Sequence, residues 1–307
     1  MLNTTQEINC LAQNDVKTLV KLSEDAYRLQ IKDVINKTIE QKDCRILLLA
    51  GPSGSGKTTS AHILEEGFKE NGVDAEVVSL DNFYLNIDQM PLDENGKPDF
   101  ETVYSLNIPE IHKCFEELLT REKTTIPIFD FAAKGVNEYR EIDIENHGIL
   151  IIEGLHAINP ILTDNLPTGS WLSVYISPQC SVFGTDGEEI LDSKGLRLAR
   201  RMSRDYLYRN TSAAGTLNLW TSVISGEQKY LYPFKEGAYI KLKTFHSFEP
   251  CVFKSIILKL LEDLNPNVEN YDEAMKLKNA LEGFYSLSQD IVPENSLIRE
   301  FILGSKY

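Results

Sequence analysis

Apolar positions in this chain follow two alternating patterns, short continuous runs and longer stretches with helical spacing. Over residues 14–41, apolar side chains recur among charged ones at intervals close to 3.6 residues, which predicts one or two amphipathic helices. Residues 45–50 (RILLLA) then form a short apolar run that ends at Gly51, as a buried parallel strand does. Residues 58–70 again have helical spacing, and Asn71 with Gly72 supplies a helix stop signal.

The same alternation continues to about residue 264. Further strands are expected at residues 75–80, 126–131, 148–153 and 171–177, and further helices at 108–119, 194–209, 214–225 and 252–264. Residues 90–99 are rich in Pro, Gly and Asp and are expected to form a loop. Strands that alternate with helices predict an α/β fold in which helices flank a doubly wound parallel sheet.

We expect three segments in the chain. They are an N-terminal helical extension over residues 1–44, a main domain over 45–264 and a C-terminal helical appendage over 265–307. For the apolar face of the extension, we favour packing against the main domain over binding to a partner. The C-terminal appendage has only weak periodicity, which predicts a peripheral position.

The charge balance limits the partners that we expect. Among 307 residues, 31 Lys and Arg face 46 Asp and Glu, so the formal net charge is −15. An acidic chain is poorly suited to bind a long nucleic acid, because such binding needs many Lys and Arg side chains to displace counterions. A small polyanionic ligand in one cleft remains compatible with this charge.

The cysteines and the N-terminus indicate the compartment. Five scattered cysteines form no CxxC pair or Cys/His cluster, which indicates neither zinc nor a disulfide framework. The N-terminus lacks the basic start and apolar run of a signal peptide, and the longest apolar runs are too short to cross a bilayer. We therefore expect a cytoplasmic protein with no membrane partner.

The loop after the first strand matches the pattern GxxxxGK[ST]. Its residues are Gly51, Pro52, Ser53, Gly54, Ser55, Gly56, Lys57 and Thr58. The glycines of such a loop let successive backbone N–H groups point at phosphate oxygens, and the helix that follows adds its positive N-terminal end. Lys57 is expected to bridge the β- and γ-phosphates, while the Thr58 hydroxyl can ligate Mg²⁺. The pattern therefore predicts a nucleoside triphosphate site.

Two carboxylates are expected near this loop, because each follows a predicted parallel strand. Glu153 ends the apolar run ILIIE, where a carboxylate can hold Mg²⁺ or its water. Asp81 comes directly after the strand AEVVSL, at the sheet edge where α/β folds bind ligands. Asp81 can accept a proton from an attacking hydroxyl or join the metal ligands, and the alternative is that it only caps the next loop.

Residues 194–209 form a basic helix with a local charge of +5, from six Lys and Arg against Asp205. Arg197, Arg200 with Arg201, and Arg204 recur at three- and four-residue spacing, so they are expected on one helix face. Such a face is often simply solvated. Beside a triphosphate site we favour an arginine-bearing lid that closes over the transferred phosphoryl group.

Together these motifs resemble the uridine kinase/phosphoribulokinase family of P-loop kinases. The resemblance covers residues 45–254 and rests on GPSGSGKTT, SLDNFY, IPIFDF, IIEG and RLARRMSRDYLYR. It is closest to bacterial uridine-kinase-like proteins in which the kinase domain follows threonyl-tRNA-synthetase-like modules, on the evidence of residues 98–101, 153–160 and 212–234. Only about 44 residues precede the first strand here, so we expect those modules, and a role in binding tRNA or threonine, to be missing.

The resemblance implies roles for individual residues. Lys57, Asp81, Arg201 and Arg204 would be catalytic, with Asp81 as the general base. ATP would be bound by residues 51–58 together with Thr59 and Arg209, and Mg²⁺ by Thr58, Asp81 and Glu153. The phosphate acceptor would be contacted by Tyr84, Phe100, Glu101, Phe129, Phe131 and Lys134.

The sequence departs from the pattern of uridine kinases on the acceptor side. Lys134 stands where those kinases have a His, and Phe129 where they have a Tyr. Glu101-Thr102-Val103 replaces their Asp-His-Pro, and Thr211 replaces a further lid Arg. These changes leave the phosphate-binding residues intact.

The sequence thus predicts an ATP- and Mg²⁺-dependent kinase that phosphorylates a hydroxyl group of a small molecule. A nucleoside is the acceptor that the resemblance implies, and the resemblance also allows a homo-oligomer. Two alternatives are a kinase with a different acceptor, such as a sugar phosphate or a polyol, and a nucleotide-binding regulatory protein without catalytic activity.

Overall fold

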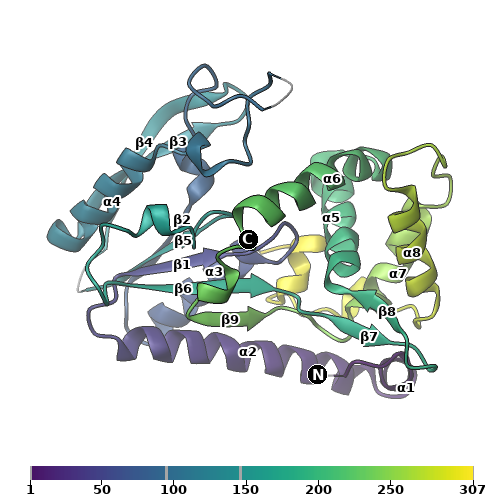
Figure 1. The fold of residues 1–307 in the computed structure, drawn as a ribbon. Coiled ribbons are helices and arrows are strands. Elements are labelled where there is room, and N and C mark those ends of the chain that lie inside the picture. Colours follow the sequence, from purple (N-terminus) through teal and green to yellow (C-terminus); the bar gives the residue numbers. More distant parts are fainter. Residues whose placement is uncertain (1, 94–95, 145–146, 307) are drawn as a thin grey trace.

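The computed structural model describes residues 2–93, 96–144 and 147–306, and a five-stranded parallel sheet forms its centre (Figure 1). The strand order is β2-β5-β1-β6-β9, and every neighbouring pair is parallel. The strands are β1 (Ile46–Ala50), β2 (Ala75–Ser79), β5 (Ile149–Glu153), β6 (Trp171–Ser177) and β9 (Ile240–Lys243). The α/β class, with a parallel sheet flanked by helices, is confirmed.

Most helices occur close to where helical spacing predicts them, whereas those at residues 5–14 and 271–282 lie outside the predicted helix ranges. They are α1 (Thr5–Asn14), α2 (Val16–Glu40), α3 (Lys57–Glu70), α4 (Ile108–Arg121), α5 (Ser193–Arg209), α6 (Ala213–Tyr230), α7 (Glu249–Leu260) and α8 (Tyr271–Glu282). Short 3₁₀ segments are η1 (Leu80–Phe83), η2 (Val103–Ser105), η3 (Pro160–Leu162), η4 (Lys235–Gly237), η5 (Gln289–Ile291) and η6 (Leu297–Phe301). Asp15 separates α1 from α2, and its carboxylate accepts a hydrogen bond from the Thr18 N–H, which caps the start of α2.

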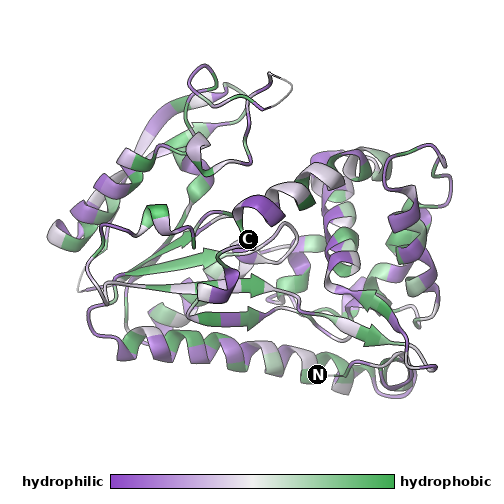
Figure 2. Ribbon diagram, in the orientation of Figure 1, coloured by the Kyte–Doolittle hydropathy of each residue, from purple (hydrophilic) through white to green (hydrophobic). Residues whose placement is uncertain are grey.

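Two hydrophobic layers cover the two faces of the sheet. The side chains of β1 alternate between them: Leu47 and Leu49 pack with α2, α3 and α7, whereas Ile46 and Leu48 pack with α4 and its neighbours. Because both faces of the central strands are buried, these strands are continuously apolar, as Figure 2 shows.

The N-terminal helix α2 lies along the sheet and contacts the helix that follows the phosphate loop (Figure 1). The Tyr27 hydroxyl and the Ser60 hydroxyl form a buried hydrogen bond of 2.8 Å. Gly67 of α3 has no side chain, so Ile35 of α2 packs directly on the α3 backbone. α2 therefore shares one core with the sheet and α3.

The predicted strand at 126–131 is found outside the parallel sheet, which corrects the sequence interpretation. It becomes β3 (Lys123–Asp130) and pairs antiparallel with β4 (Gly135–Asp143) across a turn in which Lys134 has a positive φ of 59°. A short apolar run has the same pattern in either sheet. Here the adjacent β4, which is mostly exposed, supplies its partner through a tight turn.

Two further regions have regular or buried structure that the sequence pattern did not predict. Residues within 179–194 form a second hairpin, β7 (Ser181–Phe183) with β8 (Glu189–Asp192). After α8 the chain returns to the phosphate loop, where Leu297, Ile298 and Phe301 are fully buried.

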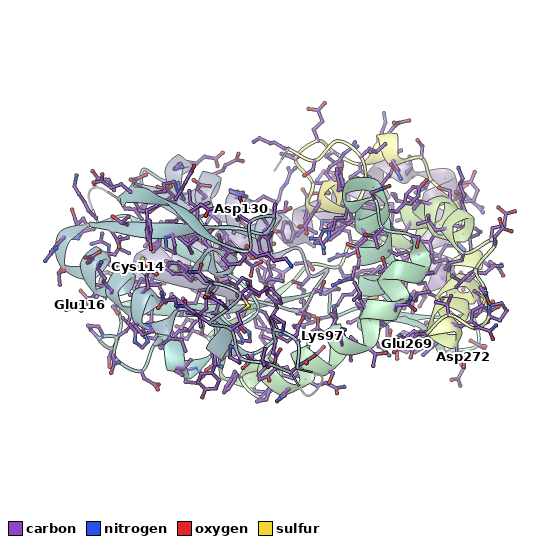
Figure 3. All side chains as sticks on the ribbon, turned by 90° about the horizontal axis from the view of Figure 1, so that it is seen from above. Lys97, Cys114, Glu116, Asp130, Glu269 and Asp272 are labelled. Carbon is purple, nitrogen blue, oxygen red and sulfur yellow. The ribbon has the colours of Figure 1, made fainter. Side chains whose placement is uncertain are left out.

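Seen from above, Glu116 of α4 and Asp272 of α8 lie at opposite ends of the molecule (Figure 3). The three-segment division itself stays a prediction.

Within the described part of the chain, none of the helices is both long enough and apolar enough to cross a membrane.

Candidate active site

The sheet brings three sequence motifs to one edge. Leu49 near the end of β1 pairs with Glu153, the last residue of β5, and Glu153 pairs with Ser79, the last residue of β2. The phosphate loop follows β1 and Asp81 follows β2, so both lie beside Glu153 at the carboxyl ends of the strands. In open α/β sheets, ligands bind at this edge.

A cavity of about 250 Å³ opens at this edge. The predicted residues that line it are Ser53, Gly54, Gly56, Lys57, Thr58, Asp81, Tyr84, Phe100, Glu101, Glu153, Arg201, Arg204 and Arg209. Sequence reasoning missed five others, Gly154, Leu155, Val223, Glu227 and Glu300. Gly51, Pro52, Ser55, Thr59, Phe129, Phe131 and Lys134 do not line it.

The phosphate loop has the backbone that its glycines allow. Gly54 and Gly56 have φ values of 74° and 88°, which side chains rarely permit. A side chain at Gly51 would collide with the carbonyl oxygen of Ile176 on the neighbouring strand β6. Lys57 is the first residue of α3, and its side chain folds back over the loop, with Nζ 3.4 Å from the Pro52 carbonyl oxygen. The loop is therefore built as a cradle for an anion at a helix N-terminus.

The arginines of α5 divide into two groups, which corrects the expectation of a single lid face. Arg200 is fully buried and forms two hydrogen bonds of 2.7 Å with Glu249. It also donates to the carbonyl oxygens of Gly54 and Ser55, at 3.1 and 3.3 Å. Arg200 thus holds the phosphate loop from behind, and its burial depends on a carboxylate far away in sequence.

Arg197 has a similar structural role. It donates to the Ser53 carbonyl oxygen at 2.8 Å and is paired with Glu227, which also accepts from the Ser53 N–H at 2.8 Å. Glu227 therefore fixes both the loop and its bracing arginine. In the sequence, Glu227 belongs to a segment (SGEQKYLYPF) that stands out only through the family resemblance, because helical spacing alone does not mark Glu227 as a site residue.

Arg201, Arg204 and Arg209 point into the cavity instead. Arg201 donates to the Ser53 hydroxyl at 2.7 Å, and both Arg201 and Arg209 are paired with Asp205, at 3.3 and 3.2 Å. Burial lowers the pKa of Arg201 and of Arg209, and Asp205 opposes this effect. These side chains can donate hydrogen bonds to phosphate oxygens in the cavity.

Lys57, Asp81 and Glu153 form a charged group in the lining of the cavity. Burial lowers the pKa of Lys57, while Glu153 and Glu300 raise it. Burial raises the pKa of Glu153, and loss of hydration raises that of Asp81, while Lys57 lowers both. Lys57 therefore stabilises both carboxylates in their charged form.

The oxygen donors at the cavity fit a magnesium ion. The Thr58 hydroxyl and the carboxylates of Asp81 and Glu153 all line it. In residues 2–93, 96–144 and 147–306, no cluster of three or more His, Cys, Asp or Glu side chains is placed to hold a metal. This donor set suits Mg²⁺, which is typically bound by one or two carboxylates together with substrate phosphates.

An aromatic group extends from the cavity toward the β3–β4 hairpin. The Tyr84 ring lies edge-on to Phe100, Phe129 and Phe131, with centroids 5.5, 5.7 and 6.3 Å apart. The Tyr84 hydroxyl donates to the Phe100 carbonyl oxygen at 3.1 Å. The four aromatic residues predicted for the acceptor thus come together, whereas Lys134 lies in the hairpin turn, where its carbonyl oxygen accepts from the Ile87 N–H.

Glu101 lies between this aromatic group and α6. A side chain at Gly226 of α6 would collide with the Glu101 carboxylate, so the glycine makes room for it. Burial, together with the charge of Glu227, raises the pKa of Glu101 to about 7, although Arg201 opposes the shift.

A glycine-rich loop between a strand and a helix, with a lysine, acidic strand ends and arginines around one cavity, defines a P-loop nucleotide-binding protein. Residues 46–182 match the model of the Phosphoribulokinase / Uridine kinase family. Residues 46–182 are therefore similar to a family of P-loop kinases, and this similarity implies ATP binding.

Curated uridine kinases are similar to a longer part of the chain. The chain is 24% identical to the uridine kinase of Ureaplasma urealyticum serovar 10 over 198 residues. This alignment covers 64% of this chain and 86% of that protein. It is 21% identical over 216 residues to the uridine kinase of Halobacterium salinarum, which covers 70% of this chain and 84% of that protein.

Among solved structures, a possible uridine kinase from Bacillus stearothermophilus aligns with a TM-score of 0.41 and 19% identity, covering 48% of this chain and 79% of that one. Phosphoribulokinase from Rhodobacter spheroides aligns with a TM-score of 0.44 and 16% identity, covering 65% and 70%.

The first prediction concerns the buried pair behind the phosphate loop. Arg200→Met leaves the Glu249 carboxylate buried without its partner, so we expect a loss of about 3–5 kcal/mol in the free energy of unfolding, measured by urea denaturation. The double variant Arg200→Met/Glu249→Leu should recover part of this loss. A double variant less stable than the single one would contradict this account.

The second prediction concerns pH. Folding raises the pKa of Glu101 from its ordinary value to about 7, so the folded protein binds one more proton than the unfolded chain between about pH 4.5 and 7. Protonation of Glu101 therefore stabilises the folded state at low pH, and this stabilisation is lost as the pH rises through about 7. Glu101→Gln should therefore gain about 1–3 kcal/mol relative to the unsubstituted protein between pH 5 and pH 8, measured by urea denaturation. A difference independent of pH would contradict it.

Proposed function

We propose that this protein is an ATP-dependent small-molecule kinase, and that it transfers the γ-phosphoryl group to a hydroxyl of a nucleoside such as uridine. The observation that carries the proposal is the common cavity: the phosphate loop, the lid arginines, Asp81 and the rings of Tyr84 and Phe100 all line it. Phosphate-binding and acceptor-binding groups thus open into the same space.

The charges of the cavity suit phosphoryl transfer. Lys57, Arg201 and Arg204 can hold the phosphate oxygens on which negative charge develops, and such preorganised donors are typically the largest contribution to catalysis. Bound Mg²⁺, held by Thr58, Asp81 and Glu153, would neutralise phosphate charge. Asp81 lies at the accessible mouth of the cavity, where it can accept the proton of the acceptor hydroxyl.

The acceptor side supports a ligand with a flat ring. The rings of Tyr84, Phe100, Phe129 and Phe131 form a continuous aromatic wall beside the cavity, and aromatic rings pack well on the face of a base. Glu101 stands next to this wall and offers a carboxyl group to hydroxyls of the acceptor. The relatives named uridine kinase support the same acceptor class.

The acceptor can be identified by measuring ADP release. Purified protein with Mg·ATP is mixed in turn with nucleosides, sugar phosphates and polyols, and we expect release that depends on a nucleoside. Release with a sugar phosphate or a polyol instead would overturn the nucleoside assignment. ATP binding without acceptor-dependent release across the panel would favour a regulatory protein.

Two substitutions test the proposed roles in the cavity. Lys57→Ala and Asp81→Asn should each lower kcat by about 100-fold or more, because the first removes charge stabilisation and the second removes the general base. Asp272→Asn, an exposed carboxylate on α8 at the far end of the molecule, is the matched control and should leave kcat unchanged (Figure 3). Near-normal turnover of Asp81→Asn would exclude its role as base.

A further inference from the structure

The segment η6, near the C-terminal end of the sequence, borders the cavity through Glu300. Ile298, Phe301 and Ile302 are fully buried, and the lid helix α5 holds the backbone of η6 and of the residue after it. The Ser203 hydroxyl donates to the Phe301 carbonyl oxygen at 2.6 Å, and the Tyr208 hydroxyl donates to that of Ile302. η6 lies outside the region that matches the family, residues 46–182.

Glu300 of η6 bridges the two helices that border the cavity. Its Oε2 accepts a hydrogen bond of 2.8 Å from the hydroxyl of Thr59, in the first turn of α3. Its Oε1 is paired at 2.9 Å with Nη1 of Arg204, on α5. The Glu300 side chain is only 13% exposed and that of Arg204 only 17%, so water screens this pair less than a surface ion pair.

Further contacts fix the same arrangement. The Phe301 ring lies 5.8 Å from the guanidinium of Arg204 and 5.0 Å from that of Arg200. Leu297 covers Gly56, so closely that a side chain at Gly56 would lie 2.7 Å from it. η6 therefore touches the phosphate loop, α3 and α5 at once.

We propose that Glu300 is a positioning residue that holds Arg204 toward the transferred phosphoryl group; this inference rests on the proposed function. One carboxylate anchors the arginine to the first turn of α3 and so sets its distance from the phosphate loop. Such preorganisation lowers the cost of ordering the arginine during the reaction.

Two observations favour positioning over a blocking role. The buried Ile298 and Phe301 fix the backbone that carries Glu300, so this backbone is held beside the cavity. Arg204 also keeps donors for phosphate, because a guanidinium carries five N–H groups and its Nε is buried without a hydrogen-bond partner among the described residues.

The position of Glu300 predicts opposite effects on binding and turnover. Its negative charge repels a bound triphosphate, so removing the charge should not weaken ATP binding. Losing its hold on Arg204 should slow phosphoryl transfer. A residue with a merely structural role would not separate these two effects.

The test compares Glu300→Gln with Glu294→Gln, which removes an exposed carboxylate three residues before η6. For Glu300→Gln we expect kcat to fall about tenfold or more while the KM for ATP stays the same or falls. Glu294→Gln should behave like the unsubstituted protein. The double variant Glu300→Gln/Arg204→Gln should be no slower than Arg204→Gln alone, because Glu300 acts through Arg204.

The kinetic measurements can overturn the inference in three ways. The first is a kcat of Glu300→Gln within twofold of that of the unsubstituted protein, and the second is a kcat that rises, as expected for an inhibitory contact. The third is that the losses of Glu300→Gln and Arg204→Gln prove additive in the double variant. Calorimetry of ATP and ADP binding gives a readout without turnover. Glu300→Gln should reduce the preference for ATP over ADP several-fold, and an unchanged preference would also overturn the inference. If the unsubstituted protein transfers phosphate to no acceptor, the proposed function fails, while this binding ratio still decides the position of Arg204.

Discussion

The buried ion pair of Arg200 and Glu249 is the interaction on which the site depends. Its guanidinium holds the carbonyl oxygens of Gly54 and Ser55, and so fixes the phosphate loop from behind. The pair is costly to bury, and removing one partner exposes that cost in full. Arg197, one turn earlier on α5, and Glu227 on α6 also brace the loop. The helix that presents the lid arginines is therefore also the support of the loop that they cover.

Sequence reasoning found the residues whose position follows from the local chain. The phosphate loop, Asp81 and Glu153 each follow a strand directly, and the ends of parallel strands meet at one edge, so their meeting could be predicted. It could not separate the buried Arg200 from the cavity-lining Arg201, because their burial depends on Glu249 and on the return of the C-terminal segment. Glu300 carries no motif and contacts Thr59 across 241 residues of sequence.

The fold was predictable to a similar depth. Four of the five strands of the parallel sheet and most helices follow from apolar runs and helical spacing, whereas strand partners do not. The apolar run at residues 126–131 predicts a strand of that sheet, but the mostly exposed β4 pairs with it instead. The short β9 and the β7–β8 hairpin were missed because runs of three or four residues carry too little periodicity.

The β3–β4 hairpin bears on how such a kinase can change over evolution. Its two strands are neighbours in sequence and pair with each other, so their contacts form and change locally. It carries Phe129 of the aromatic wall, and Phe131 follows in the turn. Ile126 and Ile142 of the hairpin pack in the same core as Ile46 and Leu48 of β1, so substitutions at these two positions would also affect the sheet. Phe131, in the turn, is 61% exposed. Under the proposed function, changes confined to this turn would alter the contacts of the acceptor and leave the phosphate loop as it is.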